Sequence, residues 1–138
     1  RGRALGFGSG LVLHCDLAVA GDTAVFGFNE IAHGFPPLIV ESYLARYVGE
    51  KAALDLVLTG RPVPAWEARS LGMIARVVPD DQLDAAGAAL VERLAGLDQR
   101  ALRAAKSFLR DVVDVPAEER PTYGLEELLR WRGFGNDE

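Results

Sequence analysis

Three glycines at alternate positions, Gly6, Gly8 and Gly10, lead directly into the apolar run 11–13. Glycine permits backbone conformations that other residues avoid, and an apolar run that follows a glycine turn can begin a buried helix. The N-terminus of such a helix presents free backbone N–H groups, which suit a negatively charged ligand. This stretch predicts a ligand site whose side-chain chemistry comes from elsewhere in the chain, and Glu30 is the best candidate to supply it.

Size and charge limit the kind of protein this is. A chain of 138 residues, 49% of them hydrophobic, can build one ordinary core or part of a larger one. The net charge is -5, and the basic residues are scattered among acidic ones, which argues against binding to nucleic acid. The partner is expected to be a small molecule or another subunit.

The single cysteine, Cys15, excludes an internal disulfide and fits a reducing compartment. No apolar run approaches the roughly 20 residues that span a bilayer, so no membrane partner is predicted and a cytoplasmic protein is expected. The sequence starts without Met and ends in a turn-like stretch over 133–138. We therefore expect it to be a segment of a longer protein.

Local patterns predict an alternation of short strands and helices. The paired prolines Pro36 and Pro37 exclude a helix interior or a central strand at that point. The predicted strands are 17–20, 24–28 and 74–78, and the predicted helices are 8–15, 39–48, 53–60, 64–71, 83–97, 102–112 and 121–131.

Three other interpretations of the glycine stretch compete with a catalytic one. A dinucleotide-binding turn would need its third glycine where Leu11 stands, so that match fails in detail. A phosphate-binding P-loop is excluded, because no Gly-Lys-Ser/Thr follows. The glycines alone could also serve only to pack a helix tightly against a sheet.

Three groups of residues, taken in order, resemble the enoyl-CoA hydratase/isomerase (crotonase) family over residues 1–112. They are Gly2, Ala4, Leu5, Gly6, Gly8, Leu11, Leu13, Cys15 and Asp16, then Phe26, Gly27, Glu30, Gly34 and Pro37, then Leu58-Thr59-Gly60-Arg61-Pro62-Val63 with Ala68, Leu71-Gly72 and Val77-Val78-Pro79. Each motif is weak alone, and together they are specific.

The resemblance implies an α/β fold, the crotonase-like (ClpP/crotonase) spiral of ββα units, here its last turns, followed by a C-terminal helical region. It implies a division into 1–80, the C-terminal part of the core, and 81–138, a helical region that packs against other subunits in a homotrimer or hexamer. Family members are about twice as long, so the chain looks like their C-terminal half.

The resemblance also implies an acyl-CoA thioester as substrate, with no separate cofactor because coenzyme A is part of that substrate. Members stabilise an enolate with two backbone N–H donors, and by position one donor is the amide of Phe7. The other donor belongs to an earlier segment. The family usually has glycine where this chain has Phe7, a ring that could narrow the pocket or mark a broken oxyanion hole.

Hydratases of the family use two glutamates, and one of those positions is Gly10 here. The other matches Glu30, preceded by Asn29. A single carboxylate can take a proton from one carbon of a dienolate and return it to another. The resemblance therefore favours a Δ3,Δ2-enoyl-CoA isomerase, with hydratase and a non-catalytic CoA-binding or oligomerising protein as alternatives.

The predicted substrate pocket consists of Gly6, Gly8, Gly10, Asn29, His33 and Pro37. A catalytic role for His33 is less favoured, because the family usually has an apolar residue there. His14 and Cys15 are predicted to be buried on the first helix, and Asp16 to be structural. No spacing of His, Cys, Asp or Glu predicts a metal site.

Overall fold

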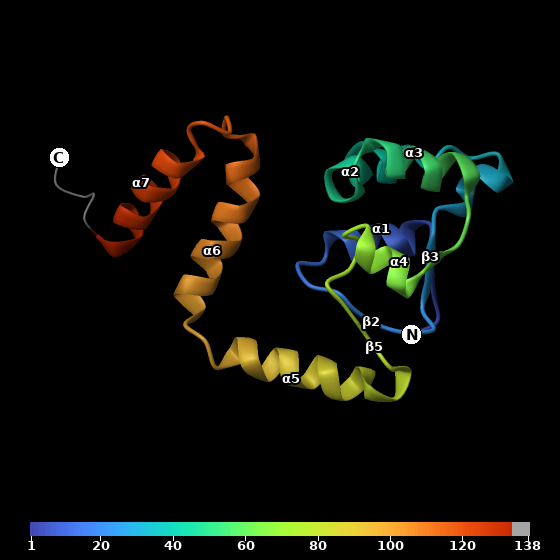
Figure 1. The fold of residues 1–138 in the computed structure, drawn as a ribbon, viewed down its shortest axis with the longest axis horizontal. Helices are drawn as coiled ribbons and strands as arrows, with labels where there is room; N and C mark the ends of the chain where they lie inside the picture. The colour runs from blue at the N-terminus through green and yellow to red at the C-terminus, as the bar shows by residue number, and fades with distance from the viewer. Residues whose placement is uncertain (134–138) are drawn as a thin grey trace. The chain divides into compact units, whose positions relative to one another are not determined.

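The computed structural model describes residues 1–133 of the chain. It divides into two compact units, Arg1–Leu90 and Val91–Glu138, with helix α5 (Leu83–Ala95) crossing the division (Figure 1). The first unit contains every strand among the described residues, and the second is helical. The functional division predicted at 80/81 rests on the family resemblance and stays a prediction.

Two small sheets form the frame of the first unit. Strand β1 (Arg3–Leu5) pairs in parallel with β3 (Val25–Gly27), with Leu5 opposite Gly27, and β4 (Val63–Pro64) adds to β3 in antiparallel orientation. Strand β2 (Val19–Gly21) pairs in parallel with β5 (Arg76–Val78). Parallel strands need long connections, and helices supply them here, which makes this an α/β unit as predicted.

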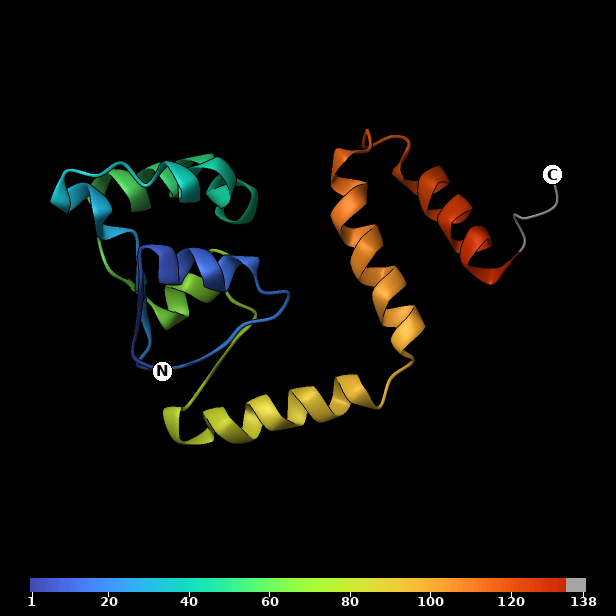
Figure 2. The ribbon, with the colours of Figure 1, turned by 180° about the vertical axis from the view of Figure 1, so that it is seen from behind.

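Helix α1 (Phe7–His14) packs against β1 and against α2 (Leu38–Val48), and α2 in turn packs against α3 (Glu50–Thr59) (Figures 1 and 2). Helix α4 (Ala65–Ser70) lies against β3, β4 and β5. The largest fully buried hydrophobic side chains of this unit are Phe28, Leu44, Leu56 and Val63. Burying each of them contributes about 1.5–3 kcal/mol, which makes this core the main support of the first unit.

Several element boundaries differ from the sequence prediction. Helix α1 begins at Phe7, one residue before the predicted start at Gly8. The strands predicted at 17–20, 24–28 and 74–78 are shorter in the structure, where β2, β3 and β5 have three residues each. A ladder extends only as far as a partner strand lies opposite, so its length is a tertiary property. Strand β4 was not predicted, because two residues carry no periodicity; its Pro64 lies at the sheet edge, where proline is tolerated.

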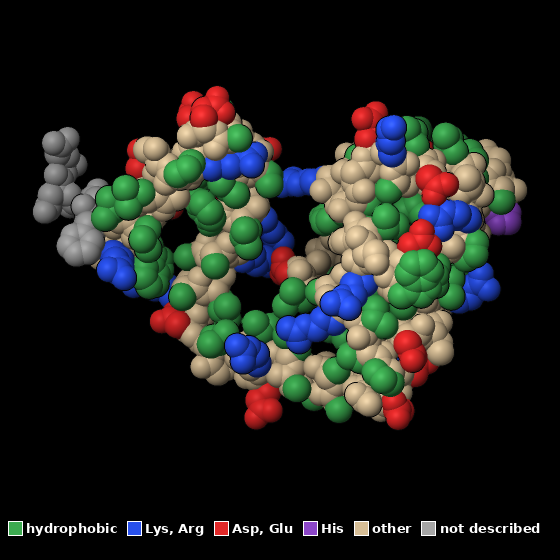
Figure 3. All heavy atoms as spheres, viewed as in Figure 1, with side chains coloured by type: hydrophobic (Ala, Val, Ile, Leu, Met, Phe, Trp, Pro, Cys, Tyr) green, Lys and Arg blue, Asp and Glu red, His purple; other side chains and the backbone are tan. Residues whose placement is uncertain are grey.

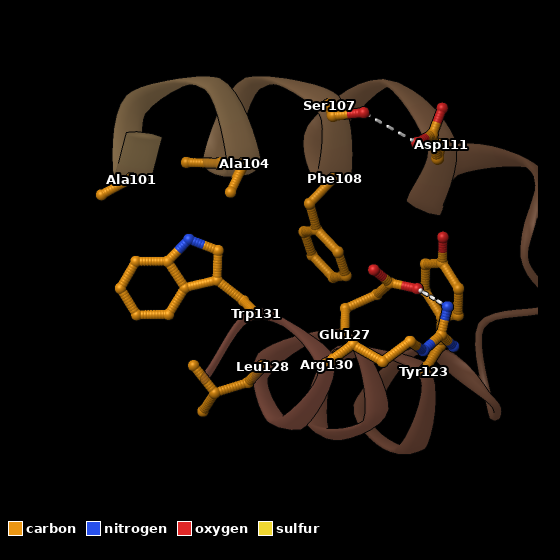
Figure 4. Close-up of a pocket in the computed structure, with 12 residues that line it drawn as sticks. Ala101, Ala104, Ser107, Phe108, Asp111, Tyr123, Glu127, Leu128, Arg130 and Trp131 are labelled. Carbon is orange, nitrogen blue, oxygen red and sulfur yellow. Dashed lines mark hydrogen bonds and ion pairs between the residues drawn. The ribbon is translucent and has the colours of Figure 1, made fainter. Parts of the chain in front are cut away.

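The second unit contains α6 (Gln99–Asp111), the 3₁₀ turn η3 (Val112–Asp114) and α7 (Arg120–Arg132). The rings of Phe108 and Tyr123 stack with centroids 5.6 Å apart, and a groove of about 720 Å³ runs between the two helices. In Figure 4, Trp131 points from α7 toward Ala101 and Ala104 of α6.

None of the described residues of α6 and α7 is buried, although both helices carry large apolar side chains. Hydrophobic side chains consequently reach the surface of this unit (Figure 3). The exposed ones on these helices include Leu109, Leu125, Leu128 and Leu129. The turn-like stretch predicted over 133–138 lies outside the described residues, except for Gly133, which ends α7 with a φ of 82°.

Helix α6 begins with a side-chain cap. Oδ1 of Asp98 accepts the backbone N–H groups of Arg100 and Ala101 at 2.8 and 2.9 Å. These bonds lower the pKa of Asp98 from its ordinary 3.8, and the bond from Ala101 has the larger effect. A carboxylate with a lowered pKa in the folded state stabilises the helix above its unfolded pKa, and this contribution is lost as pH falls through the folded value.

We therefore expect the amides of Arg100 and Ala101 to lose protection against hydrogen exchange as pH falls below about 4. Asp98→Asn is the matched control, because asparagine caps helices without titrating in this range. Exchange measured by NMR and corrected for intrinsic rates should show an acid-dependent loss only with Asp98. An equal loss in the Asp98→Asn protein would contradict this account.

No helix among the described residues combines the length and the apolar character needed to cross a bilayer.

Candidate active site

Gly6 forms the corner between β1 and α1. Its φ of 56° and ψ of -122° belong to a region that is open to glycine and strained for other residues. Its N–H donates to the carbonyl oxygen of Gly27 at 2.8 Å, which fixes the corner to the end of β3. A Cβ at this position would lie 2.8 Å from Oε1 of Glu30. The first glycine of the stretch is therefore in contact with the candidate base.

Ser9 fastens this corner to the sheet. The side chain is fully buried in α1, its hydroxyl donates to the carbonyl oxygen of Ala4 at 2.6 Å, and its oxygen accepts the N–H of Gly27 at 3.0 Å. One side chain thus joins α1, β1 and β3. Sequence reasoning missed it, although a lone serine among glycines and apolar residues in a helix without a polar face was a usable signal.

Ser9→Ala is expected to lower the free energy of unfolding by about 1–3 kcal/mol, because it leaves the Gly27 N–H without its partner. Urea unfolding of the whole protein would measure this. Ser70→Ala is the control, since Ser70 is exposed and bonds only the carbonyl of Trp66 one turn earlier in its own helix. Equal stability of the two variants would show that the Ser9 bonds contribute nothing.

Glu30 lies in the 3₁₀ turn η1 (Asn29–His33), one residue after the end of β3. Glu30 is half-buried, and its Oε2 atom is buried without a hydrogen-bond partner among the described residues. An unpaired buried carboxylate oxygen is costly, and such groups usually have a ligand or proton to hold. Glu30 therefore has a free acceptor beside the start of α1.

The turn that follows α3 packs against η1. Gly60, with a φ of 60°, ends α3, and a Cβ there would lie 3.2 Å from Cγ2 of Ile31. Arg61 holds this turn through ion pairs of 2.6 Å to Glu67 and 2.7 Å to Asp55. Hydrogen bonds to these two carboxylates raise the pKa of Arg61, and the bonds to Glu67 have the larger effect. The guanidinium therefore stays charged at neutral pH.

Phe7 is the first residue of α1. Its backbone N–H therefore has no hydrogen-bond acceptor within the helix, as is general for the first turn of a helix. The ring is 72% exposed, and it does not lie in the core of this unit. The amide is available as a donor, and the helix dipole favours negative charge at this end. Other exposed apolar side chains follow η1 in the sequence, namely Phe35, Leu38 and Ile39.

Gly10 lies one turn after Gly6, and the space beside it has no room for a side chain. A Cβ would lie 2.5 Å from the hydroxyl oxygen of Tyr43 and 3.2 Å from Cγ2 of Val40, both from α2. The sequence indicated that no carboxylate stands at residue 10. It did not indicate that a tyrosine fills the space above it, because the two residues are far apart in the chain.

The other predicted pocket residues lie in or beside the same elements. Gly8 is in α1, Asn29 begins η1, and the buried Pro37 directly precedes α2. His33 ends η1 and is exposed. Within residues 1–133, no group of three or more His, Cys, Asp or Glu side chains could hold a metal ion.

The predicted burial of His14 and Cys15 is wrong, since both are exposed. Helix α1 buries Ser9, Gly10 and Leu13, which share one face at a spacing of three to four residues. His14, one turn after Gly10, is the last residue of α1 and stays exposed with its ring edge-on to that of Tyr43, and Cys15 follows the end of the helix. Because α1 is apolar on nearly all sides, its sequence does not indicate which of its faces packs against the sheet and α2.

Comparison with known proteins identifies relatives of this chain. The sequence model of the enoyl-CoA hydratase/isomerase family matches residues 1–129. The 2,3-dehydroadipyl-CoA hydratase of Escherichia coli is 36% identical over 130 residues, which cover 90% of this chain and 51% of that protein.

Solved structures agree with the sequence comparison. The crystal structure of an enoyl-CoA hydratase from Mycobacterium smegmatis is 31% identical, with a TM-score of 0.85 over 92% of this chain and 49% of that one. A Thermobifida fusca protein crystallised with CoA is 34% identical, with a TM-score of 0.84 over 99% of this chain and 54% of that one. The chain spans about half the length of the relatives it matches.

Proposed function

Because the chain belongs to the enoyl-CoA hydratase/isomerase family, we propose that it carries the proton-transfer site of an enzyme acting on enoyl-CoA thioesters, most specifically a Δ3,Δ2-enoyl-CoA isomerase. One observation carries this proposal. The Glu30 carboxylate is held against Gly6 at the start of α1 with one buried oxygen unpaired, and the next turn of the same helix offers no second carboxylate.

In this reaction, Glu30 removes a proton from C2 of a 3-enoyl-CoA. The electrons of the C–H bond move into a dienolate whose negative charge lies largely on the thioester oxygen. The N–H of Phe7, at the positive end of the α1 dipole, stabilises that charge together with the second donor expected from outside this chain. The protonated Glu30 then returns the proton to C4, which leaves the double bond between C2 and C3.

Isomerisation is favoured over hydration because of Gly10. Adding water across a double bond requires a group that orients and deprotonates the water and a group that manages the proton delivered to C2. In this site Glu30 is the carboxylate beside Gly6, while Gly10 is covered by Tyr43 and Val40. One carboxylate suffices for a proton shuttle, in which the same proton leaves and returns.

Hydration is the second candidate, since the named relatives above are hydratases. Assays of the whole protein with a 3-enoyl-CoA and a 2-enoyl-CoA separate the two reactions by their products. Isomerisation of the first without efficient hydration of the second supports the proposal. Robust hydration would overturn the isomerase assignment, and binding without turnover would favour a non-catalytic family member.

We also propose an acyl-CoA as the ligand and a homotrimer or hexamer as the assembly. The CoA complex of the Thermobifida fusca relative supports the first. The unburied apolar side chains of α6 and α7 support the second, because exposed apolar surface of this kind usually marks an interface. In this proposal the chain supplies the last turns of the crotonase-like core and its C-terminal helices.

A further inference from the structure

Tyr43 is a polar side chain beside the site to which the proposed reaction gives no role. It lies on α2, is half-buried, and places its hydroxyl oxygen 2.5 Å from the position of a Cβ on Gly10. Its ring meets the ring of His14 edge-on at 4.1 Å and that of Tyr47 at 6.5 Å. Contacts from α1 and α2 therefore fix the orientation of the ring, which aims its hydroxyl at α1.

Helix geometry relates this hydroxyl to the candidate base. Gly6 caps α1 and its carbonyl oxygen accepts the N–H of Gly10 at 3.1 Å, so the two glycines are one turn apart, about 6 Å along the helix axis. The Glu30 carboxylate covers the first of these glycines, and the Tyr43 hydroxyl covers the second. The carboxylate and the hydroxyl thus cover two glycines that are one helical turn apart.

We propose that Tyr43 is a specificity-determining residue of this acyl-CoA site, because its hydroxyl fills the space over Gly10 and presents one neutral donor there instead of a second base. This inference rests on the proposed function. A substrate held at Glu30 meets the phenol one turn further along α1. The phenol excludes an activated water from that place.

Burial supports the assignment of a neutral donor. It raises the pKa of Tyr43 above its ordinary 10.0, with a smaller contribution from Tyr47. The hydroxyl therefore stays protonated at neutral pH, so it can donate a hydrogen bond and cannot deprotonate water. A carboxylate in the same place would do the opposite.

The position of the hydroxyl is tested first, without any assay of activity. Gly10→Ala should lower Tm by about 2–4 °C in the whole protein, because the new methyl group meets the Tyr43 hydroxyl. In a Tyr43→Phe background the nearest atom of the ring is Cζ at 3.8 Å, an ordinary contact, so the same change should cost less. Equal losses in the two backgrounds would overturn the placement.

The chemical role is tested by variants assayed with 3-enoyl-CoA and 2-enoyl-CoA. Tyr43→Phe should lower kcat/KM for isomerisation roughly tenfold, the loss of about one hydrogen bond, without new hydration. Ser42→Ala, which removes an exposed hydroxyl of the same helix that bonds the carbonyl oxygen of Ile39, should leave isomerisation unchanged. Equal activity of Tyr43→Phe and the wild-type protein would overturn the role of the hydroxyl.

A second carboxylate should become useful only after Tyr43 is removed. Gly10→Glu with Tyr43→Ala is expected to hydrate 2-enoyl-CoA at least tenfold faster than the wild-type protein. Gly10→Glu alone should not hydrate it. Hydration by the single variant, at wild-type stability, would overturn the exclusion by Tyr43. Hydration by the wild-type protein would instead overturn the proposed isomerase function, so the two failures are distinguishable.

Discussion

Glu30→Gln is expected to lower the isomerisation rate by about 100- to 10,000-fold, the range typical of removing a general acid–base group. The amide keeps the size and polarity of the side chain but cannot take a proton from C2. Product formation from a 3-enoyl-CoA, followed in the whole protein, measures the effect. Affinity for the acyl-CoA should change little, because the variant leaves the proposed oxyanion donor, the N–H of Phe7, unchanged.

Glu41→Gln is the matched control, since Glu41 is an exposed carboxylate in the first turn of α2. It should leave both rate and affinity unchanged. A Glu30→Gln protein with full isomerase activity would show that the proton shuttle is another group. Loss of acyl-CoA binding in that variant would place Glu30 in substrate binding instead of chemistry.

Gly6→Ala is expected to have the second largest effect, because it combines two separate penalties. The φ and ψ of Gly6 strain any residue with a Cβ, at a cost of about 1–3 kcal/mol. The new methyl group also comes within 2.8 Å of Glu30 Oε1 and must displace the carboxylate. Small displacements of a reacting group can cost about 100-fold in rate, so activity should fall more than stability alone explains.

Gly2→Ala separates the two penalties. Gly2 also has a positive φ, 74°, but a Cβ there would meet nothing within 4 Å. Gly2→Ala should lose stability through strain alone, and therefore less than Gly6→Ala in urea unfolding, and only Gly6→Ala should lose most of its kcat. If Gly2→Ala were equally inactive, backbone strain and not the contact with Glu30 would explain the loss.

The sequence predicted most elements of the fold from local patterns. Prolines excluded a helix at 36–37, and apolar spacing located α2 through α7 to within a few residues. These features depend on neighbours in the chain, which a local pattern can describe. Element ends were less accurate, because the lengths of β2 and β5 depend on the residues they pair with across more than 50 positions.

The candidate site was predicted in part. The glycine stretch was identified from its own residues, the family resemblance gave Glu30 its role, and the structure brings Glu30 and Gly6 into contact. The resemblance could not show what occupies the space at Gly10. The residues that fasten or fill the site, Ser9 and Tyr43, belong to no motif, so only their contacts reveal them.

The sequence by itself determined the kind of site: a glycine corner that only glycine can form, a helix N-terminus after it, and one carboxylate downstream. Those properties follow from backbone sterics and residue chemistry, which are local. The tertiary structure decided that Glu30 faces Gly6 while Tyr43 covers Gly10 one turn further along α1. Packing of η1 and α2 against that helix fixed both choices, because residues distant in the chain must share the limited space beside it.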